Sequence, residues 1–170
     1  KEDQIISSHR SHAHYLAKGG SLKKMIAELY GRVTGCCEGR GGSMHLFDKS
    51  CNMLSSIPIV ASSIPLALGV AMSNKIKNNK CVSLVFFGDG AIEEGVFHES
   101  MNFASVHRLP VIFVCENNKY SVYTNLKERQ PRRPIEKFAL SHNMSVKKLD
   151  GFSIEDVYIK AGIVIENVRK

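Results

Sequence analysis

The chain has 170 residues, 44% of them hydrophobic and 23% charged, with 13 glycines and 5 prolines. This length suits a single domain with one core, and the composition argues against disorder, collagen-like repeats and a disulfide-dense secreted module. The 23 Lys and Arg against 16 Asp and Glu give a formal net charge of +7, which favours anionic partners from a single diphosphate to nucleic acid. A merely solvated basic surface is the commoner cause, so charge alone selects no function.

The five cysteines are odd in number and include no C-x-x-C pair. Free thiols in a reducing cytoplasm explain this pattern better than disulfides or a zinc site. The first residues do not have the pattern of a signal peptide. Residues 50–74 carry no charge, but their six Ser, two Asn and two Pro indicate buried core, so we expect no membrane span.

The first half of the chain predicts two helices and a buried strand. Ser21 caps an amphipathic helix over 22–30, and a loop with five glycines follows between Gly31 and Gly42. A second helix is predicted from Ser62 onward, with a proline in its first turn. Residues 81–87 are almost continuously apolar, which is typical of a strand buried on both faces of a parallel sheet.

The second half predicts a helix over 93–107 and another buried strand over 111–115. Strand, helix and strand with short joints indicate a right-handed βαβ unit. Further elements are expected: a polar, basic connection over 124–134, a helix over 135–142, a short strand over 145–149 and a last helix that Ser153 caps. We therefore expect an α/β fold in one domain over 1–170, with a mostly parallel sheet and helices on both faces.

The most informative residues follow the two buried strands. Gly88-Asp89-Gly90 ends the first strand and Asn117-Asn118 ends the second, one βαβ crossover later. Adjacent ends of parallel strands bring the Asp89 carboxylate and the Asn118 carboxamide to the crevice where open α/β sheets bind ligands. Both offer hard oxygen ligands that suit Mg²⁺ with substrate phosphate in its shell, and the two glycines allow a phosphate to approach the backbone.

Two alternatives remain at this point. Gly-Asp-Gly alone is common, and an ordinary strand-to-helix turn with a capping Asp89 would also explain it. A plain nucleotide-binding domain is the weaker alternative, because the sequence contains neither G-x-G-x-x-G nor G-x-x-x-x-G-K-[ST].

Three arginines, Arg129, Arg132 and Arg133, form a basic patch without interleaved aromatic residues. We interpret this patch as a solvated loop rather than a nucleic-acid surface.

Longer stretches carry a resemblance to a known family. FGDGAIEEGVFHESMNFA (87–104) and LPVIFVCENNKY (109–120) resemble the alpha subunit of the thiamine-diphosphate-dependent first component of 2-oxo-acid dehydrogenase complexes. Similar stretches are HRSHAH (9–14), GCCEG (35–39), GGSMH (41–45) and IPL (64–66), so the resemblance covers about 8–151. The pyruvate and acetoin branch is the most similar, and the vicinal Cys36-Cys37 and the His-rich opening resemble acetoin-type members.

This resemblance implies thiamine diphosphate and Mg²⁺ as cofactors. It assigns Mg²⁺ ligation to the Asp89 carboxylate, the Asn118 side-chain oxygen and the Tyr120 main-chain carbonyl. It also implies that Gly90 and Ala91 offer backbone N–H groups to the diphosphate.

Four further residues receive cofactor roles by the same resemblance. Arg10 would contact the diphosphate as a cation, and Ile59 and Val60 would hold the aminopyrimidine ring. His12 matches a family histidine near the cofactor that shuttles protons or fixes a loop, and it is the catalytic candidate.

Departures from the family pattern affect substrate choice more than cofactor binding. His9 stands where the family usually has tyrosine, and Ser121 replaces a usual glycine. Pro58 and Ala61 replace the glycines of a Gly-Ile-Val-Gly stretch, so contacts to the aminopyrimidine would differ.

The resemblance also implies partners and a reaction. A beta subunit would carry the glutamate that activates the cofactor, so Glu93 and Glu94 are not given that role. Two alpha and two beta chains would decarboxylate a small 2-oxo acid such as pyruvate, or cleave acetoin, and pass the fragment to a lipoyl-bearing acyltransferase. The alternative is a thiamine-diphosphate-binding module without lipoyl-linked activity. Family alpha subunits are longer, so we expect a truncated or partly ordered chain that lacks leading helices, the last strand and a loop with a catalytic histidine.

Overall fold

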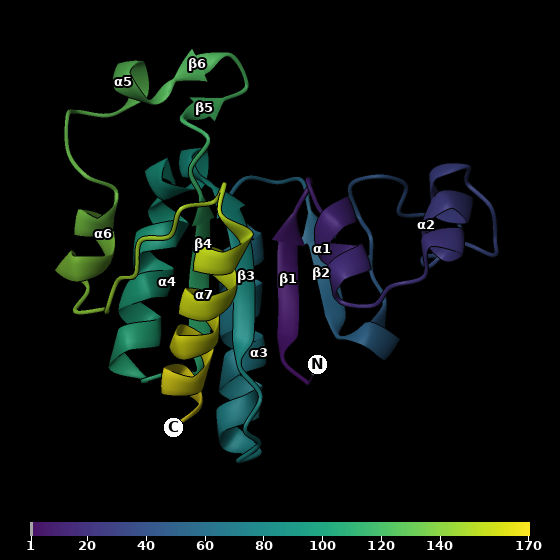
Figure 1. Ribbon diagram of the computed structural model, residues 1–170, viewed down its shortest axis with the longest axis horizontal. Coiled ribbons are helices and arrows are strands. Elements are labelled where there is room, and N and C mark those ends of the chain that lie inside the picture. The colour runs from purple at the N-terminus through teal and green to yellow at the C-terminus, as the bar shows by residue number, and fades with distance from the viewer. Residues whose placement is uncertain (1) are drawn as a thin grey trace.

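The computed structural model describes residues 2–170, which form a four-stranded parallel sheet with helices around it (Figure 1). The strand order is β2-β1-β3-β4. The strands are β1 (Gln4–Ser8), β2 (Met53–Ile57), β3 (Ser83–Gly88) and β4 (Val111–Glu116). Every pairing in this sheet is parallel, which confirms the predicted α/β class.

The predicted βαβ unit forms one end of the sheet, where β4 is the outer strand of the order. β3 pairs with β4 from Ser83 opposite Val111 to Gly88 opposite Glu116, so both strands end at the same edge. The crossover contains the 3₁₀ turn η2 (Asp89–Glu93) and α4 (Gly95–Val106). Sequence periodicity predicted this helix from residue 93, but its first regular turn comes two residues later, after η2.

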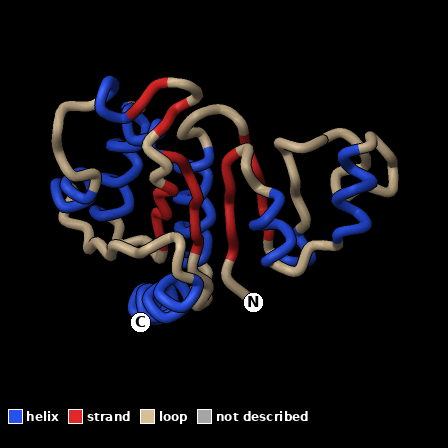
Figure 2. Tube along the Cα trace, turned by 45° about the horizontal axis from the view of Figure 1, so that its top comes forward, coloured by secondary structure: helices blue, strands red, loops and turns tan. Residues whose placement is uncertain are grey.

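Helices cover both faces of the sheet, as predicted. α3 (Ser63–Ile76) packs on β3, on β1 and on α4 at one face, whereas α7 (Ile154–Arg169) crosses the other face beside β4 (Figures 1 and 2). The main core lies between the sheet and the layer that contains α3 and α4. Its fully buried side chains include Ile64, Val85 and Ile92.

A second, smaller core lies beside β1 and β2. It contains Tyr15, Met25, Leu46 and Met53, all buried. The elements around it are α1 (His12–Ala17), α2 (Leu22–Leu29) and the 3₁₀ turn η1 (Lys49–Cys51). The Ser21 side chain accepts a hydrogen bond from the Lys24 N–H at 3.3 Å, which confirms the predicted cap of α2. The elements β1, α1 and β2 were not predicted.

The second half departs from prediction in two places. Residues 145–149 are irregular rather than a strand, because no neighbouring strand in the described chain pairs with them. The basic connection is partly regular: a hairpin of β5 (Tyr120–Ser121) and β6 (Thr124–Asn125) leads into α5 (Leu126–Arg129). The helix α6 (Glu136–Ser141) and the Ser153 cap of α7 are confirmed.

The uncharged segment over 50–74 forms β2 and most of α3, and it contributes Met53, Ile64 and Ala67 to the buried core. Ile59 and Val60, between the two elements, are exposed. Across residues 2–170, no helix is both long and apolar enough to pass through a membrane.

Candidate functional site

Asp89 follows directly after β3, at the carboxyl edge of the sheet, and is fully buried. Its Oδ2 accepts a hydrogen bond from Arg129, but its Oδ1 is buried with no hydrogen-bond partner among residues 2–170. Leaving such an acceptor unpaired costs about 1–3 kcal/mol. A buried carboxylate oxygen without a partner therefore offers a position for a cation.

Arg129 brings positive charge to this carboxylate from α5. Its guanidinium forms ion pairs with Asp89 and Glu93, and only 10% of its side chain is exposed. The interpretation of Arg129 as part of a solvated loop was therefore wrong, because the β5–β6 hairpin folds back over η2. Arg132 and Arg133 are exposed, and the Arg133 guanidinium carbon lies 4.1 Å from the centre of the Phe138 ring.

The glycines around Asp89 permit close approach of neighbouring groups. A Cβ added to Gly90 would lie 2.8 Å from the Ser121 Oγ. This distance is too short for a Cβ contact, so the Ser121 side chain would have to move. A Cβ at Gly88 would lie 3.3 Å from the Arg10 Nη2. Arg10 and Ser121, distant in sequence, therefore both reach the end of β3, where Gly90 and Ala91 lie in the first turn of η2.

The end of β4 supplies the other predicted oxygen ligands. Asn118 lies two residues after β4, at the edge where Asp89 lies, because the two strands are parallel neighbours. The Asn118 Oδ1 accepts the Tyr120 N–H at 2.9 Å, and both side chains are exposed. The carboxamide is thus fixed by a turn at the edge of the sheet.

Glu116 contacts two basic side chains of the N-terminal segment, and sequence reasoning did not identify it. The Arg10 Nη2 lies 4.0 Å from the Glu116 carboxylate and the His14 Nε2 lies 3.6 Å from it. His14 also forms a 2.7 Å hydrogen bond with the Ser7 hydroxyl, and its ring lies 4.1 Å from that of Phe86. The HRSHAH stretch contained His14, but only tertiary contacts distinguish it.

His12 contacts a different part of the chain, the glycine-rich loop. Its Nε2 forms a hydrogen bond with the Ser43 hydroxyl at 2.9 Å, which joins the start of α1 to the end of the glycine-rich loop. This contact fits the loop-fixing alternative of the two expected for His12.

Ile59 and Val60 follow β2, which ends at the same edge as β3 because β1 is parallel to both. Their side chains are 69% and 55% exposed. Ala61 has a φ of +62°, a left-handed conformation that favours glycine. An open aliphatic surface at this edge could cover one face of an aromatic ring.

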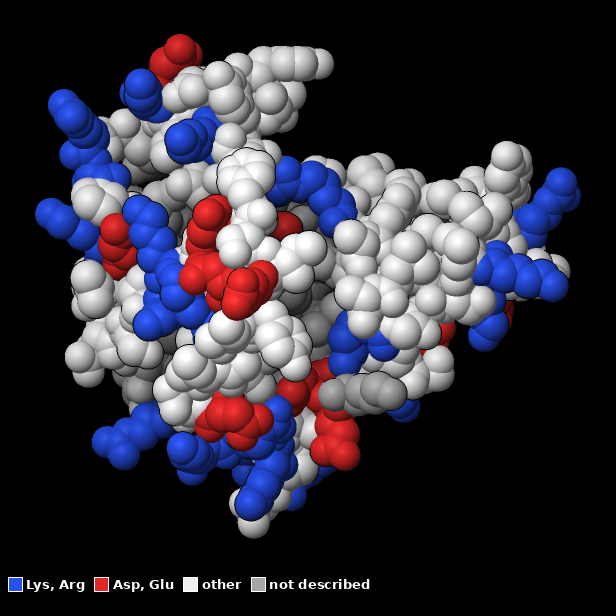
Figure 3. Space-filling view, viewed as in Figure 1, with Lys and Arg blue, Asp and Glu red and all other residues white. Residues whose placement is uncertain are grey.

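The charges on the face shown in Figure 3 are mixed. Basic side chains form several separate groups around the rim, with acidic groups between them (Figure 3). The formal net charge of +7 is therefore not gathered into one patch on this face.

Comparisons with known proteins agree with this architecture. The family model described as "Dehydrogenase E1 component" matches residues 1–170. The alpha subunit of an acetoin:2,6-dichlorophenolindophenol oxidoreductase from Bacillus subtilis (strain 168) is 44% identical over 167 residues, which are 98% of this chain and 50% of that protein.

Two relatives have pyruvate dehydrogenase names. The pyruvate dehydrogenase E1 component subunit alpha of Rickettsia typhi (strain ATCC VR-144 / Wilmington) is 38% identical over 170 residues, which are 100% of this chain and 52% of that protein. The chloroplastic subunit alpha-3 of Arabidopsis thaliana is 44% identical over 128 residues, 72% of this chain and 30% of that protein.

The chain spans about half the length of the first two of these relatives. The match to the family model over every residue, the high identity and the parallel sheet confirm the predicted resemblance. The chain therefore belongs to the dehydrogenase E1 component family, for which thiamine diphosphate is the implied cofactor.

Proposed function

We propose that this chain is the diphosphate-holding part of an alpha subunit that, with a beta subunit, decarboxylates a small 2-oxo acid such as pyruvate or cleaves acetoin. The observation that carries this proposal is the fully buried Asp89, whose Oδ1 lacks a partner within residues 2–170 at the carboxyl edge of β3. The names of the relatives support the two substrate classes.

The residues at this edge suit thiamine diphosphate with Mg²⁺. The Asp89 carboxylate, the Asn118 side-chain oxygen and the Tyr120 carbonyl are hard oxygen donors, the kind that Mg²⁺ prefers. Gly90 and Ala91 lie in the turn η2, whose backbone N–H groups would meet a diphosphate, and Arg10 reaches the same strand end. Mg²⁺ ligation by these three residues is part of the proposal.

The chain's own groups would bind and orient the cofactor. Arg10 and the metal would neutralise the diphosphate charge, while Ile59 and Val60 would exclude water from one side of the aminopyrimidine ring. When bound, thiamine diphosphate would supply the nucleophilic carbon and the electron sink that cleavage of the carbon–carbon bond requires. His12, tied to Ser43, would hold the nearby loop or carry a proton at its Nε2.

Three partner statements belong to the same proposal. A beta subunit would supply the activating glutamate, the two kinds of chain would form a heterotetramer, and a lipoyl-bearing acyltransferase would receive the fragment. The exposed apolar side chains of α7, such as Ile154 and Tyr158 at 89% and 81% exposure, support an extensive covered surface in the whole protein. We also propose a cytoplasmic location, because the five cysteines have free thiols.

The test is dichlorophenolindophenol reduction by the full alpha chain purified with its beta partner, with acetoin or pyruvate as the substrate. We expect reduction that requires thiamine diphosphate and one of these substrates, and that Asp89→Asn abolishes. Cofactor binding without reduction of the dye by either substrate would favour the binding-module alternative.

A further inference from the structure

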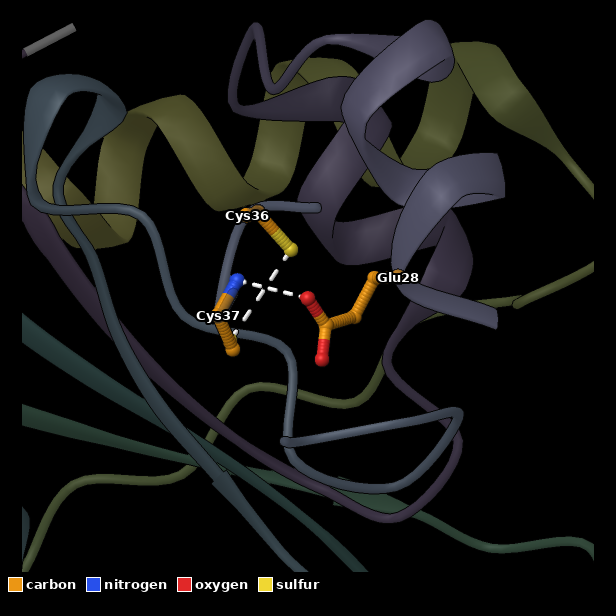
Figure 4. Close-up of side chains that lie close together, drawn as sticks. All are labelled: Glu28, Cys36 and Cys37. Carbon is orange, nitrogen blue, oxygen red and sulfur yellow. Dashed lines mark hydrogen bonds between the residues drawn. The ribbon is translucent and has the colours of Figure 1, made fainter. Parts of the chain in front are cut away.

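The glycine-rich loop is built around one buried carboxylate. Glu28, on α2, is fully buried, and each of its oxygens accepts two backbone N–H groups. Figure 4 shows one of these four bonds, from the Cys37 N–H. Oε2 accepts from Cys37 at 2.8 Å and Gly39 at 2.9 Å, and Oε1 accepts from Gly41 at 2.7 Å and Gly42 at 3.1 Å. The loop therefore has a defined conformation around a negative charge.

The backbone of this loop comes so close to Glu28 that side chains are excluded. A Cβ added to Gly35 would lie 2.2 Å from the Glu28 Oε2 and 2.7 Å from the Glu28 Cα. Gly39 has a φ of +78°, and a Cβ there would lie 2.6 Å from the backbone of Gly31. This geometry holds Cys36 and Cys37, which lie between the two glycines, against the carboxylate.

Cys36 and Cys37 bring two thiols to this carboxylate. Their Sγ atoms are 3.9 Å apart, and both residues are half-buried (Figure 4). Two thiolates on a tetrahedral ion with zinc–sulfur bonds of about 2.3 Å lie about 3.8 Å apart. The Cys36 and Cys37 sulfurs thus already have the separation that such an ion requires.

The charge around the thiols also favours a cation. One ligand atom from each of Glu28, Cys36 and Cys37 lies within 4.8 Å of the others. A thiol that coordinates the ion would lose its proton to solvent.

We propose that Cys36 and Cys37, beside the Glu28 carboxylate, form a binding site for a soft divalent cation of the Zn²⁺ and Cd²⁺ class. Each thiol releases one proton to solvent and forms one bond to the ion, and no electrons are transferred. Thiolate sulfur selects such ions over Mg²⁺, whereas the oxygen donors at Asp89 favour Mg²⁺. This site is therefore chemically distinct from the one at the sheet edge, and it does not depend on the proposed function.

The test is a Cd²⁺ titration of the full alpha chain in complex with its beta partner, followed by the ultraviolet charge-transfer absorption of cadmium thiolates. The wild type is compared with Cys36→Ser, Cys37→Ser and the control Cys51→Ser, a half-buried cysteine outside the cluster. We expect the Cd²⁺ affinity to fall about tenfold or more in Cys36→Ser and in Cys37→Ser, and to stay unchanged in Cys51→Ser. All three variants keep the backbone N–H groups that hold Glu28.

A second measurement uses only the wild-type protein. Zn²⁺ should slow the alkylation of Cys36 and Cys37, read by mass spectrometry of the peptides, and leave that of Cys51 unchanged. Equal Cd²⁺ affinity in Cys37→Ser and wild type, or equal alkylation rates with and without Zn²⁺, would overturn the proposal.

Discussion

At Glu28, one side chain determines the path of a whole loop. Replacing it by alanine leaves four backbone N–H groups without their acceptor, and hydrogen bonds to a charged group contribute about 1.5–3 kcal/mol each before the loop relaxes. We expect Glu28→Ala to lower the free energy of unfolding by about 3 kcal/mol or more, measured by urea denaturation. A loss within the error of the wild-type value would show that the loop holds itself without the carboxylate.

The same residue predicts a pH dependence. Burial alone would raise the pKa of Glu28, but four backbone N–H donors together hold this pKa below its ordinary value of 4.5. A folded-state pKa below the unfolded one means that this stabilisation is present above about pH 4.5 and is lost as pH falls through the folded-state value. We expect the stability difference between wild type and Glu28→Gln to shrink on acidification below about pH 4.5. A difference that stays constant down to acid unfolding would contradict this sign.

Arg129 supplies the only ion-pair partner of Asp89 within residues 2–170. Removing one partner of a buried ion pair costs about 3–5 kcal/mol, so we expect Arg129→Met to unfold at a clearly lower temperature than wild type. If Asp89 binds Mg²⁺, the ion should restore more stability to Arg129→Met than to the wild type. Thermal unfolding with and without Mg²⁺ checks this, with the exposed Arg132→Met as the control. Equal Mg²⁺ effects in all three proteins would argue against a metal at Asp89.

At the scale of single elements, the β5–β6 hairpin contains a strained turn. Val122 has a φ of +53°, where a β-branched residue is unfavourable, and its side chain is 83% exposed. We expect Val122→Gly to stabilise the protein by about 0.5–1 kcal/mol, after the greater freedom of glycine in the unfolded chain is subtracted. Tyr123→Gly, next in the same turn but without a positive φ, should destabilise it. Thermal unfolding of both variants checks this, and a lower midpoint for Val122→Gly would contradict it.

The strands show what sequence periodicity could and could not predict. β3 and β4 were predicted because their apolar residues are nearly continuous. β1 and β2 were missed because small polar residues are buried in them: Ser7 and Ser56 are 0% and 2% exposed. The Ser56 hydroxyl donates to the Met44 and Leu46 carbonyls, each at 3.1 Å, and such partners are invisible in the sequence.

The candidate site was predictable in part for a similar reason. Asp89 and Asn118 stood out because two strand ends in one βαβ unit must share an edge. Arg129 could not be predicted, since its ion pair depends on the path of the hairpin that brings it back over η2. Glu28 lies on the polar side of the helical pattern in α2, and it is buried only because the following loop returns over it.

At the scale of the whole molecule, Arg169 joins the last helix to the first strand segment. Its guanidinium donates to both Asp3 oxygens at 3.0 and 2.8 Å and to the Lys80 carbonyl at 2.8 Å. No residue of α7 is fully buried, so we expect this contact to contribute to holding the helix against the rest of the chain.

We expect Arg169→Ala to cost about 1–2 kcal/mol and to speed hydrogen exchange of the α7 amides more than those of β3. Lys160→Ala, which removes an i,i+4 ion pair within α7, is the control. Equal exchange in Arg169→Ala and wild type would show that apolar contacts alone hold α7.

The central claim is that the Asp89 edge of the sheet holds thiamine diphosphate through Mg²⁺. The most direct test is calorimetric titration of the cofactor into the full alpha chain in complex with its beta partner, with and without Mg²⁺. We predict Mg²⁺-dependent binding that Asp89→Asn abolishes and that Glu94→Gln, an exposed carboxylate in the same connection, preserves. Equally tight binding by a folded Asp89→Asn complex would contradict the claim.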